Sequence, residues 1–314
     1  MCASYVSETT GKRGGVAQRG RMRVTLLHNR SAGSENHAEH EIEASMRRAG
    51  HEIVDVVSKL DELLATLSKR RPDLIVIAGG DGTVSRAACA LAGRHVPMAI
   101  LPLGTANNTA LSLGVKGSMD ALVAGWARGT HRRFDLATVV EGDELAPFSE
   151  VVGWGVFPDV MAETEDMPSP AEREDTLERD RRSFRANIER AKPDHYEIDV
   201  DGETIAGEFL LVEVVNIPYI GPQLELSPSS NPSDGRFELV LAGESERAAL
   251  LELARGGTIA EGARLPTRSA THVTVRSAAR RYHLDGKLIE LSRRPSEWVI
   301  TIEPAVVEYL LSGG

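Results

Sequence analysis

The chain has 314 residues, which suits two domains of ordinary size, and 41% of them are hydrophobic, enough for a core in each domain. The formal net charge of −10 at pH 7 disfavours nucleic acid as a partner and broad adhesion to an anionic membrane, because both attract basic surfaces. The sequence has two isolated cysteines, no secretory signal and no apolar run of the ~20 residues that a spanning helix needs. We therefore expect a cytoplasmic protein that makes at most peripheral contact with a membrane.

Residues 1–21 are rich in Gly, Ser and Thr and are expected to form a disordered tail. Over residues 22–140, short apolar segments alternate with segments whose apolar residues recur at helical spacing. The expected elements are, in chain order, strand 24–29, helix 38–49, strand 52–57, helix 60–67, strand 74–78, helix 84–91, strand 97–104 and helix 119–126. This alternation predicts an α/β domain with a mostly parallel, doubly wound sheet that carries helices on both faces.

The pattern changes near Arg133, and residues 141–303 are expected to form a β-rich, sandwich-like domain. Helical spacing is confined there to two segments, 172–191 and 245–255. The expected strands are 132–140, 148–157, 195–200, 207–217, 236–242, 271–277, 282–286 and 297–303. Residues 304–314 either finish this domain or return to the first one. An exposed edge strand in the β-rich domain would permit a homodimer.

A glycine-rich loop follows the third expected strand, at Gly79–Thr83. In an open α/β sheet, ligands bind at the carboxyl ends of the strands. Glycines let backbone N–H groups approach a phosphate, and the following helix points its positive end at the same place. Asp81 would repel a phosphate unless it serves a Mg²⁺ ion or the proton of an acceptor hydroxyl. The alternative is a tight turn in which Asp81 caps the helix.

A second loop, Leu101–Ala110, follows the fourth expected strand and should lie at the same sheet edge. Gly104 allows close approach of a ligand, and Thr105 offers a neutral hydrogen-bonding group. Asn107 and Asn108 either contact a ligand or cap the next helix. The first loop is not a Walker loop, because no Gly-Lys-Ser/Thr follows it, and it lacks the third glycine of a dinucleotide fingerprint.

Together the two loops resemble those of the diacylglycerol kinase catalytic-domain family, which includes bacterial lipid kinases and sphingosine kinases. Further stretches carry the resemblance over Val24 to Tyr309: "LLHNRSAG", "FDLATV", "LELSPSSNPSDGRFELVLA" and "LDGKLIE". The resemblance implies an ATP- and Mg²⁺-dependent kinase with a nucleotide cleft between its domains, and a lipid-like acceptor such as diacylglycerol or a sphingoid base. It implies a nucleotide site formed by Asn29, Ser58, Gly79, Gly80, Asp81, Gly82, Thr83, Ser85, Gly104, Thr105 and Asn107.

The resemblance also implies a Mg²⁺ site at Asp234, completed by backbone carbonyls near Asn231 and Arg236, although "NPSDGR" is also a good turn sequence. For catalysis we expect Asp81 and Asp285, with Asp285 as the general base. The family's Leu-Asp-Gly-Glu reads Leu-Asp-Gly-Lys here, and Lys287 is a poor base because it is cationic at neutral pH.

Two other functions fit parts of the sequence. NAD kinase shares the Gly-Gly-Asp-Gly loop, but it needs an Asn-Glu pair where this chain has Asn107-Asn108. A nucleotide-binding regulatory protein without transferase activity would suit Lys287 and the polar segment 169–194. Glu150 stands where the family often has Asn, so the acceptor pocket departs from the family more than the nucleotide site does.

Overall fold

The structure is a computed structural model that describes residues 20–29, 38–164, 173–259, 264–292 and 296–313. The predicted disordered tail therefore lies almost wholly outside the described residues. No helix among the described residues is long and apolar enough to cross a membrane.

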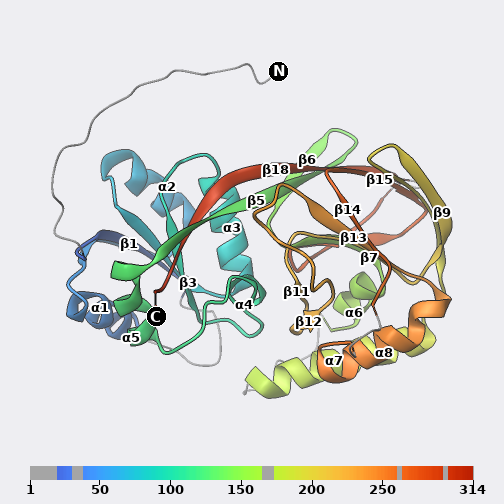
Figure 1. Cartoon of the computed structure of the whole chain (residues 1–314), viewed down its shortest axis with the longest axis horizontal. Helices are drawn as coiled ribbons and strands as arrows, with labels where there is room; N and C mark the ends of the chain where they lie inside the picture. Colours follow the sequence, from blue (N-terminus) through green and yellow to red (C-terminus); the bar gives the residue numbers. More distant parts are fainter. Residues whose placement is uncertain (1–19, 30–37, 165–172, 260–263, 293–295, 314) are drawn as a thin grey trace.

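The first domain is a parallel sheet between two layers of helices (Figure 1). Apolar residues of β3 (Leu74–Gly79) alternate between the two cores, with Ile75 and Ile77 on one face and Val76 on the other. This is why the strand reads as one continuous apolar run. The strands lie in the order β2 (Glu52–Val57), β1 (Arg23–His28), β3, β4 (Met98–Pro102). Helices α1 (Glu39–Arg48) and α5 (Met119–Gly125), with the 3-10 turn η1 (Trp126–Arg128), cover one face, and α2 (Leu60–Lys69), α3 (Asp81–Leu91) and α4 (Asn108–Ser112) cover the other.

The second domain is an antiparallel sandwich. Its first layer continues the sheet of the first domain, and its second layer is a separate six-stranded sheet. The first layer contains β5 (Thr130–Glu141), β6 (Glu144–Phe148), β18 (Ser296–Leu311), β15 (His272–Ser277), β8 (Asp194–Val200) and β9 (Glu203–Phe209). The second contains β14 (Thr267–Ala270), β13 (Phe237–Ala242), β10 (Leu211–Val215), β7 (Val151–Gly155), β16 (Arg281–Leu284) and β17 (Lys287–Glu290). A small hairpin joins β11 (Tyr219–Ile220) to β12 (Leu224–Glu225). The predicted fold class, an α/β domain followed by a β-sandwich, is confirmed.

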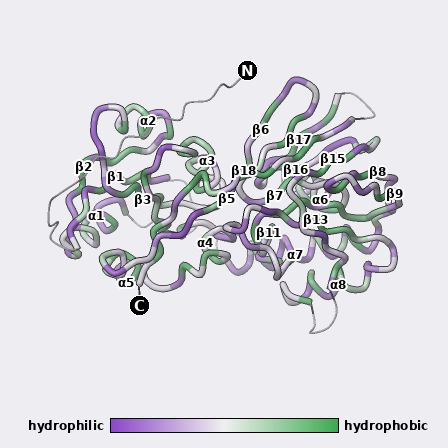
Figure 2. Tube along the Cα trace, turned by 45° about the horizontal axis from the view of Figure 1, so that its top comes forward, coloured by the Kyte–Doolittle hydropathy of each residue, from purple (hydrophilic) through white to green (hydrophobic). Residues whose placement is uncertain are grey.

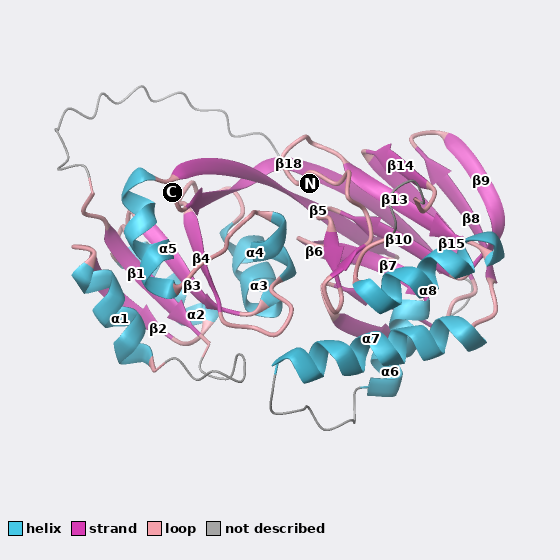
Figure 3. Ribbon diagram, turned by 60° about the horizontal axis from the view of Figure 1, so that its bottom comes forward, coloured by secondary structure: helices cyan, strands magenta, loops and turns pink. Residues whose placement is uncertain are grey.

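The core of the sandwich lies between the two layers, where the rings of Trp154 and Trp298 pack with their centroids 5.0 Å apart. Three helices cover the outer face of the six-stranded sheet (Figure 3): α6 (Val156–Thr164), α7 (Arg173–Arg190) and α8 (Arg247–Gly256), which follows the 3-10 turn η2 (Glu244–Glu246). Most of α7 is hydrophilic (Figure 2), and it contacts this core through a few apolar residues such as Phe184 and Ile188. Helix α7 is therefore a solvated helix with a narrow apolar face.

Two predicted strands are wrong in their extent. The strand expected over 148–157 ends at Gly155, whose φ of +91° turns the chain into α6, and a Cβ there would lie 2.1 Å from the carbonyl oxygen of Leu210. The strand expected over 207–217 is divided at Leu210 into β9 and β10, which belong to different sheets. Both breaks occur where the chain changes layers.

Two long strands, β5 and β18, run through both domains. Strand β18 pairs with β5 over nearly its whole length and is interrupted by a bulge at 303–307, where Ala305 has a φ of +57°. Beyond the bulge, Tyr309 pairs with Met98 of β4 in the first domain. The predicted strand 297–303 and the C-terminal segment are thus one strand, which links the two domains.

Asp135 of β5 fixes the bulge between the domains. Its Oδ1 accepts a hydrogen bond from the backbone N–H of Ala305 at 2.6 Å, and its Oδ2 accepts one from Gly235 at 2.7 Å. The side chain is 1% exposed, and burial raises the pKa of Asp135 above its ordinary value. Two partly buried N–H groups from distant parts of the chain therefore depend on this one carboxyl.

We expect Asp135→Ala to lower the free energy of unfolding by about 2–4 kcal/mol, because two partly buried donors lose their buried acceptor. Chemical denaturation measures this change. The exposed Asp143 is the matched control, and Asp143→Ala should stay within about 0.5 kcal/mol of the wild type. An Asp135→Ala protein as stable as the control would contradict the assigned role.

Candidate active site

The two glycine loops meet at the carboxyl edge of the parallel sheet. A Cβ on Gly104 would lie 2.3 Å from the Cα of Gly80, and a Cβ on Gly80 would lie 3.0 Å from the Cα of Gly104. The backbone N–H of Leu103 donates to the carbonyl of Gly79 at 3.1 Å. Residues 24 positions apart in the sequence thus form one continuous backbone surface, and neither contact glycine has room for a side chain.

Asn107 shapes the second loop. It has a φ of +55°, its Oδ1 accepts from the backbone N–H of Gly104 at 2.8 Å, and its Nδ2 donates to the Gly104 carbonyl at 2.7 Å. The Asn107 side chain therefore does not cap α4, as one sequence interpretation had it. Asn29 makes a similar link at the end of β1, where its Nδ2 donates to Thr83 Oγ1 at 2.9 Å.

Gly82 lies beside this contact, in the first turn of α3, and its surroundings are open. A Cβ built on Gly82 meets no atom within 4 Å, and the residue is exposed. Helical backbone suits an alanine at this position, so packing within the protein does not explain the glycine. A ligand that approaches the helix N-terminus closely would explain it.

Asp81 faces the second loop and the second domain. Its Oδ1 accepts a hydrogen bond from the backbone N–H of Thr109 at 3.1 Å, so it does not cap its own helix. Its carboxyl also lies within hydrogen-bonding reach of Glu150. Burial raises the pKa of Asp81, and the backbone N–H groups of Asn108 and Thr109 partly oppose that rise.

Asp285 lies in the turn between β16 and β17 with a φ of +44° and joins the second domain to α3. Its Oδ1 accepts from the backbone N–H groups of Glu150 at 2.8 Å and Val151 at 3.0 Å. Its Oδ2 accepts from Ser149 N at 2.7 Å, from Ser149 Oγ at 3.2 Å and from Ser85 Oγ. A carboxylate has about four lone-pair positions, so these donors occupy all of them. Ser85, expected in the nucleotide site, is directed to Asp285.

Glu150, which we did not include among the expected site residues, completes the acidic cluster. It is 5% exposed, and Thr109 Oγ1 donates to its Oε1. Burial raises the pKa of Glu150 well above its ordinary value, and the charges of Asp81 and Asp285 raise it further. The sequence signal was a carboxyl at a position where the resembled family often has an amide.

The remaining expected residues lie around this centre. Ser58 is exposed after β2, where its backbone N–H donates to Glu62 at 3.1 Å. Thr105 lies in the second loop beside Gly104, and Lys287 is exposed at the start of β17. Their roles stay predictions.

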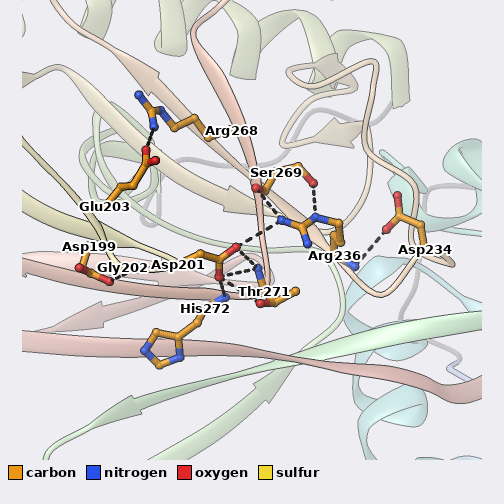
Figure 4. Close-up of polar contacts among 10 residues, drawn as sticks. All are labelled: Asp199, Asp201, Gly202, Glu203, Asp234, Arg236, Arg268, Ser269, Thr271 and His272. Atoms are coloured by element: carbon orange, nitrogen blue, oxygen red, sulfur yellow. Dashed lines mark hydrogen bonds and ion pairs between the residues drawn. The ribbon is translucent and has the colours of Figure 1, made fainter.

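The expected Mg²⁺ residues lie in a turn that its own hydrogen bonds close (Figure 4). Asp234 Oδ1 accepts from the backbone N–H of Arg236 at 3.0 Å, and the Arg236 guanidinium bonds Ser269 Oγ at 2.8 Å. Asn231 Oδ1 accepts from the guanidinium of Arg132 at 2.9 Å. Within the described ranges, no group of three or more His, Cys, Asp or Glu residues could hold a metal ion. A site made of one carboxylate and backbone carbonyls is not such a group, so the Mg²⁺ site at Asp234 stays a prediction.

Comparisons with known proteins agree with this architecture. A family model described as "Diacylglycerol kinase catalytic domain" matches residues 23–139, and one described as "YegS C-terminal NAD kinase beta sandwich-like domain" matches residues 182–310. The diacylglycerol kinase of Mycobacterium tuberculosis (strain H37Rv) is 28% identical over 244 residues, which are 74% of this chain and 76% of the relative. The diacylglycerol kinase of Bacillus subtilis is 27% identical over 251 residues, 76% of this chain and 78% of the relative.

Solved structures show the same fold. A crystal structure of a diacylglycerol kinase from Bacillus anthracis superposes with a TM-score of 0.67 at 18% identity, over 92% of this chain and 97% of that one. Yeast NADH kinase in complex with NADH gives a TM-score of 0.50 at 12% identity, over 95% of this chain and 84% of that one. With family models on both domains and relatives along three quarters of its length, the chain belongs to the diacylglycerol kinase catalytic-domain family.

Proposed function

We propose that the protein transfers the γ-phosphoryl group of ATP to a hydroxyl of a lipid or lipid-like acceptor. The observation that carries the proposal is the backbone contact between Gly80 and Gly104 beside the carboxyl of Asp81. Backbone N–H groups without side chains can hold phosphate oxygens, and a nearby carboxylate can accept the proton that the acceptor hydroxyl loses. The relatives named diacylglycerol kinase support a lipid-like acceptor.

In the proposed reaction, the two glycine loops and the N-terminus of α3 hold the triphosphate, and Asp81 accepts the hydroxyl proton. Mg²⁺ accompanies ATP and would neutralise charge that develops on the transferred phosphoryl group. The hydrogen bonds support Asp81 over Asp285 as the proton acceptor, because backbone and hydroxyl donors already occupy the Asp285 oxygens. We therefore assign to Asp285 the positioning of residues 149–151 against α3, in place of the general-base role expected from the sequence.

An acceptor screen tests the proposed function. The protein is incubated with Mg²⁺ and ATP labelled at the γ-phosphate, and diacylglycerol, a sphingoid base and NAD are offered in turn. Label on a lipid is the expected result. Formation of NADP would assign an NAD kinase instead, and tight ATP binding without transfer to any acceptor would assign a nucleotide-binding regulatory protein.

A substitution at the open position Gly82 distinguishes a phosphate-binding loop from a loop that is only a structural turn. We expect Gly82→Ala to keep or slightly raise the melting temperature, because alanine favours a helix by about 1 kcal/mol over glycine. The same change should weaken ATP binding by about tenfold or more, since the methyl group would take the place of a phosphate oxygen. Calorimetric titration with ATP measures the affinity.

The matched control is Gly256→Ala at the end of α8, where a Cβ also meets nothing within 4 Å and the backbone is helical. It should leave ATP affinity unchanged. Unchanged affinity in Gly82→Ala as well would mean that the loop is only a turn.

A further inference from the structure

Glu150 brings a carboxyl of the second domain against the loops of the first. It lies between β6 and β7, and its backbone N–H donates to Asp285 at 2.8 Å. Its side chain extends to Thr109, whose hydroxyl donates to Oε1, and to Asp81. The backbone N–H of the same Thr109 donates to Asp81 at 3.1 Å. One threonine therefore holds both carboxyls, and the side chains of Asp81 and Glu150 are neighbours across the domain boundary.

The groups that face Glu150 carry no positive charge. They are Asp81 from α3, Asp285 from the β16–β17 turn and the hydroxyl of Tyr309 from β18. In the described part of the chain, no Lys, Arg or His side chain forms a hydrogen bond or ion pair with Glu150 or Asp81. Backbone N–H groups donate to the carboxyls of Asp285 and Asp81, whereas among the described residues the Glu150 carboxyl accepts a hydrogen bond only from the Thr109 hydroxyl.

Two carboxylates in contact, one buried and one half-buried, cannot both be ionised at low cost, so the pair favours a state that retains one proton. The hydrogen-bond donors around the two carboxyls determine which of them holds this proton. An N–H donor stabilises the ionised form of Asp81, and Glu150, which is the more buried of the two, lacks such a donor. Burial and the two neighbouring carboxylates raise the pKa of Glu150 in the same direction.

We propose that Glu150 is a positioning residue for Asp81: as a neutral carboxylic acid it donates a hydrogen bond to the Asp81 carboxylate and, with Thr109, holds that carboxylate in place. The role in turnover rests on the proposed function, because Asp81 is the proton acceptor there. The protonation state of Glu150 is a separate claim that holds for the protein without any substrate.

The pH dependence follows from the direction of the shift. Because the pKa of Glu150 is raised, its proton stays bound to a higher pH than the proton of an ordinary glutamate does, and it leaves as the pH rises further. An ionised Glu150 cannot donate to Asp81 and repels it. The kcat of the wild type should therefore fall on the alkaline side, and a side chain that has no proton to lose should not show that decrease.

Kinetics of two variants test the positioning role. Glu150→Gln keeps the shape and a donor, so it should retain most of kcat and lose the alkaline decrease. Glu150→Ala removes the donor and should lower kcat by about 10–10²-fold, the cost of a misplaced catalytic group. Exposed Glu144 of β6 supplies the control, Glu144→Gln, which should match the wild type at every pH. A folded Glu150→Gln protein as impaired as Glu150→Ala would overturn the proposal, since it would mean that an ionised carboxylate is required.

Infrared spectroscopy tests the protonation state without any activity. At neutral pH the wild type should show the C=O stretch of a protonated carboxylic acid that is absent from Glu150→Gln, and the Glu144→Gln spectrum should match the wild type. No difference band between wild type and Glu150→Gln would overturn the proposal even in an active enzyme. If no acceptor is phosphorylated but the band is present, the kinase assignment fails while the shared proton stands.

Discussion

Asp81→Asn should lower phosphoryl transfer by about 10²–10⁴-fold, the usual contribution of a general base. An asparagine has nearly the same shape as aspartate, and its oxygen can still accept the hydrogen bond that Thr109 donates. The amide cannot accept a proton at any accessible pH. The loss should therefore appear in kcat, with the affinity for ATP and the melting temperature close to those of the wild type.

Steady-state kinetics on the acceptor found in the screen, together with thermal denaturation, measure both parts of this expectation. The control is Asp61→Asn, an equally conservative change of an exposed aspartate in α2 of the same domain, which should leave kcat unchanged. Full activity in Asp81→Asn would remove Asp81 from the chemistry. A large drop in melting temperature would show that its main role is to join α3 to α4.

Local sequence patterns were sufficient to predict the first domain. The apolar run of β3 and the helical spacing around it describe a strand buried on both faces, and the signal lies within a few residues. Ser118 precedes the expected helix 119–126 and is of a residue type that favours the N-cap, and its side chain accepts from the backbone N–H of Ala121 at 3.4 Å. The meeting of the two glycine loops also follows from local order, because adjacent parallel strands end at one edge.

The acidic cluster depends on contacts that no local pattern contains. The Asp285 carboxylate accepts hydrogen bonds from residues more than 130 positions earlier in the chain. Backbone N–H groups such as those of Ser149 and Glu150 occupy its lone pairs. From the sequence alone, we expected Asp285 to be a general base with an oxygen free to accept a proton. Gly153 is a similar case, because a Cβ there would lie 1.7 Å from Oε2 of Glu213, a buried carboxyl that His283 Nε2 contacts at 2.9 Å. Such a contact between a glycine and a distant side chain is set by the tertiary structure, and no local sequence pattern predicts it.

The same holds for the connection between the domains. The strand pattern of β18 is interrupted at Pro304, so the sequence suggested two segments. In the structure they form one strand with a bulge at Ala305. The bulge is stable because Asp135, 170 residues earlier, accepts the Ala305 N–H. A single long strand therefore links the two halves of the candidate site.

Gly104→Ala should have the second large effect, because it separates the two loops that form the phosphate surface. The new Cβ would lie 2.3 Å from the Cα of Gly80 and 2.9 Å from Oδ1 of Asn107. The first contact is with backbone, which cannot rotate away as a flexible side chain does. The loops must move apart, and the hydrogen bonds that Asn107 makes to Gly104 weaken with them.

Such overpacking costs about 1–3 kcal/mol of stability, which chemical denaturation would detect. ATP binding should fall much further than the stability, because phosphate oxygens need both loops at once and a displacement of about 1 Å costs about 10²-fold in a positioned site. Gly256→Ala again serves as the control for both measurements. Normal ATP affinity in a Gly104→Ala protein would mean that the triphosphate does not lie on this surface. The contact between Gly80 and Gly104 would then be a packing feature of the sheet edge, and the kinase proposal would lose the observation that carries it.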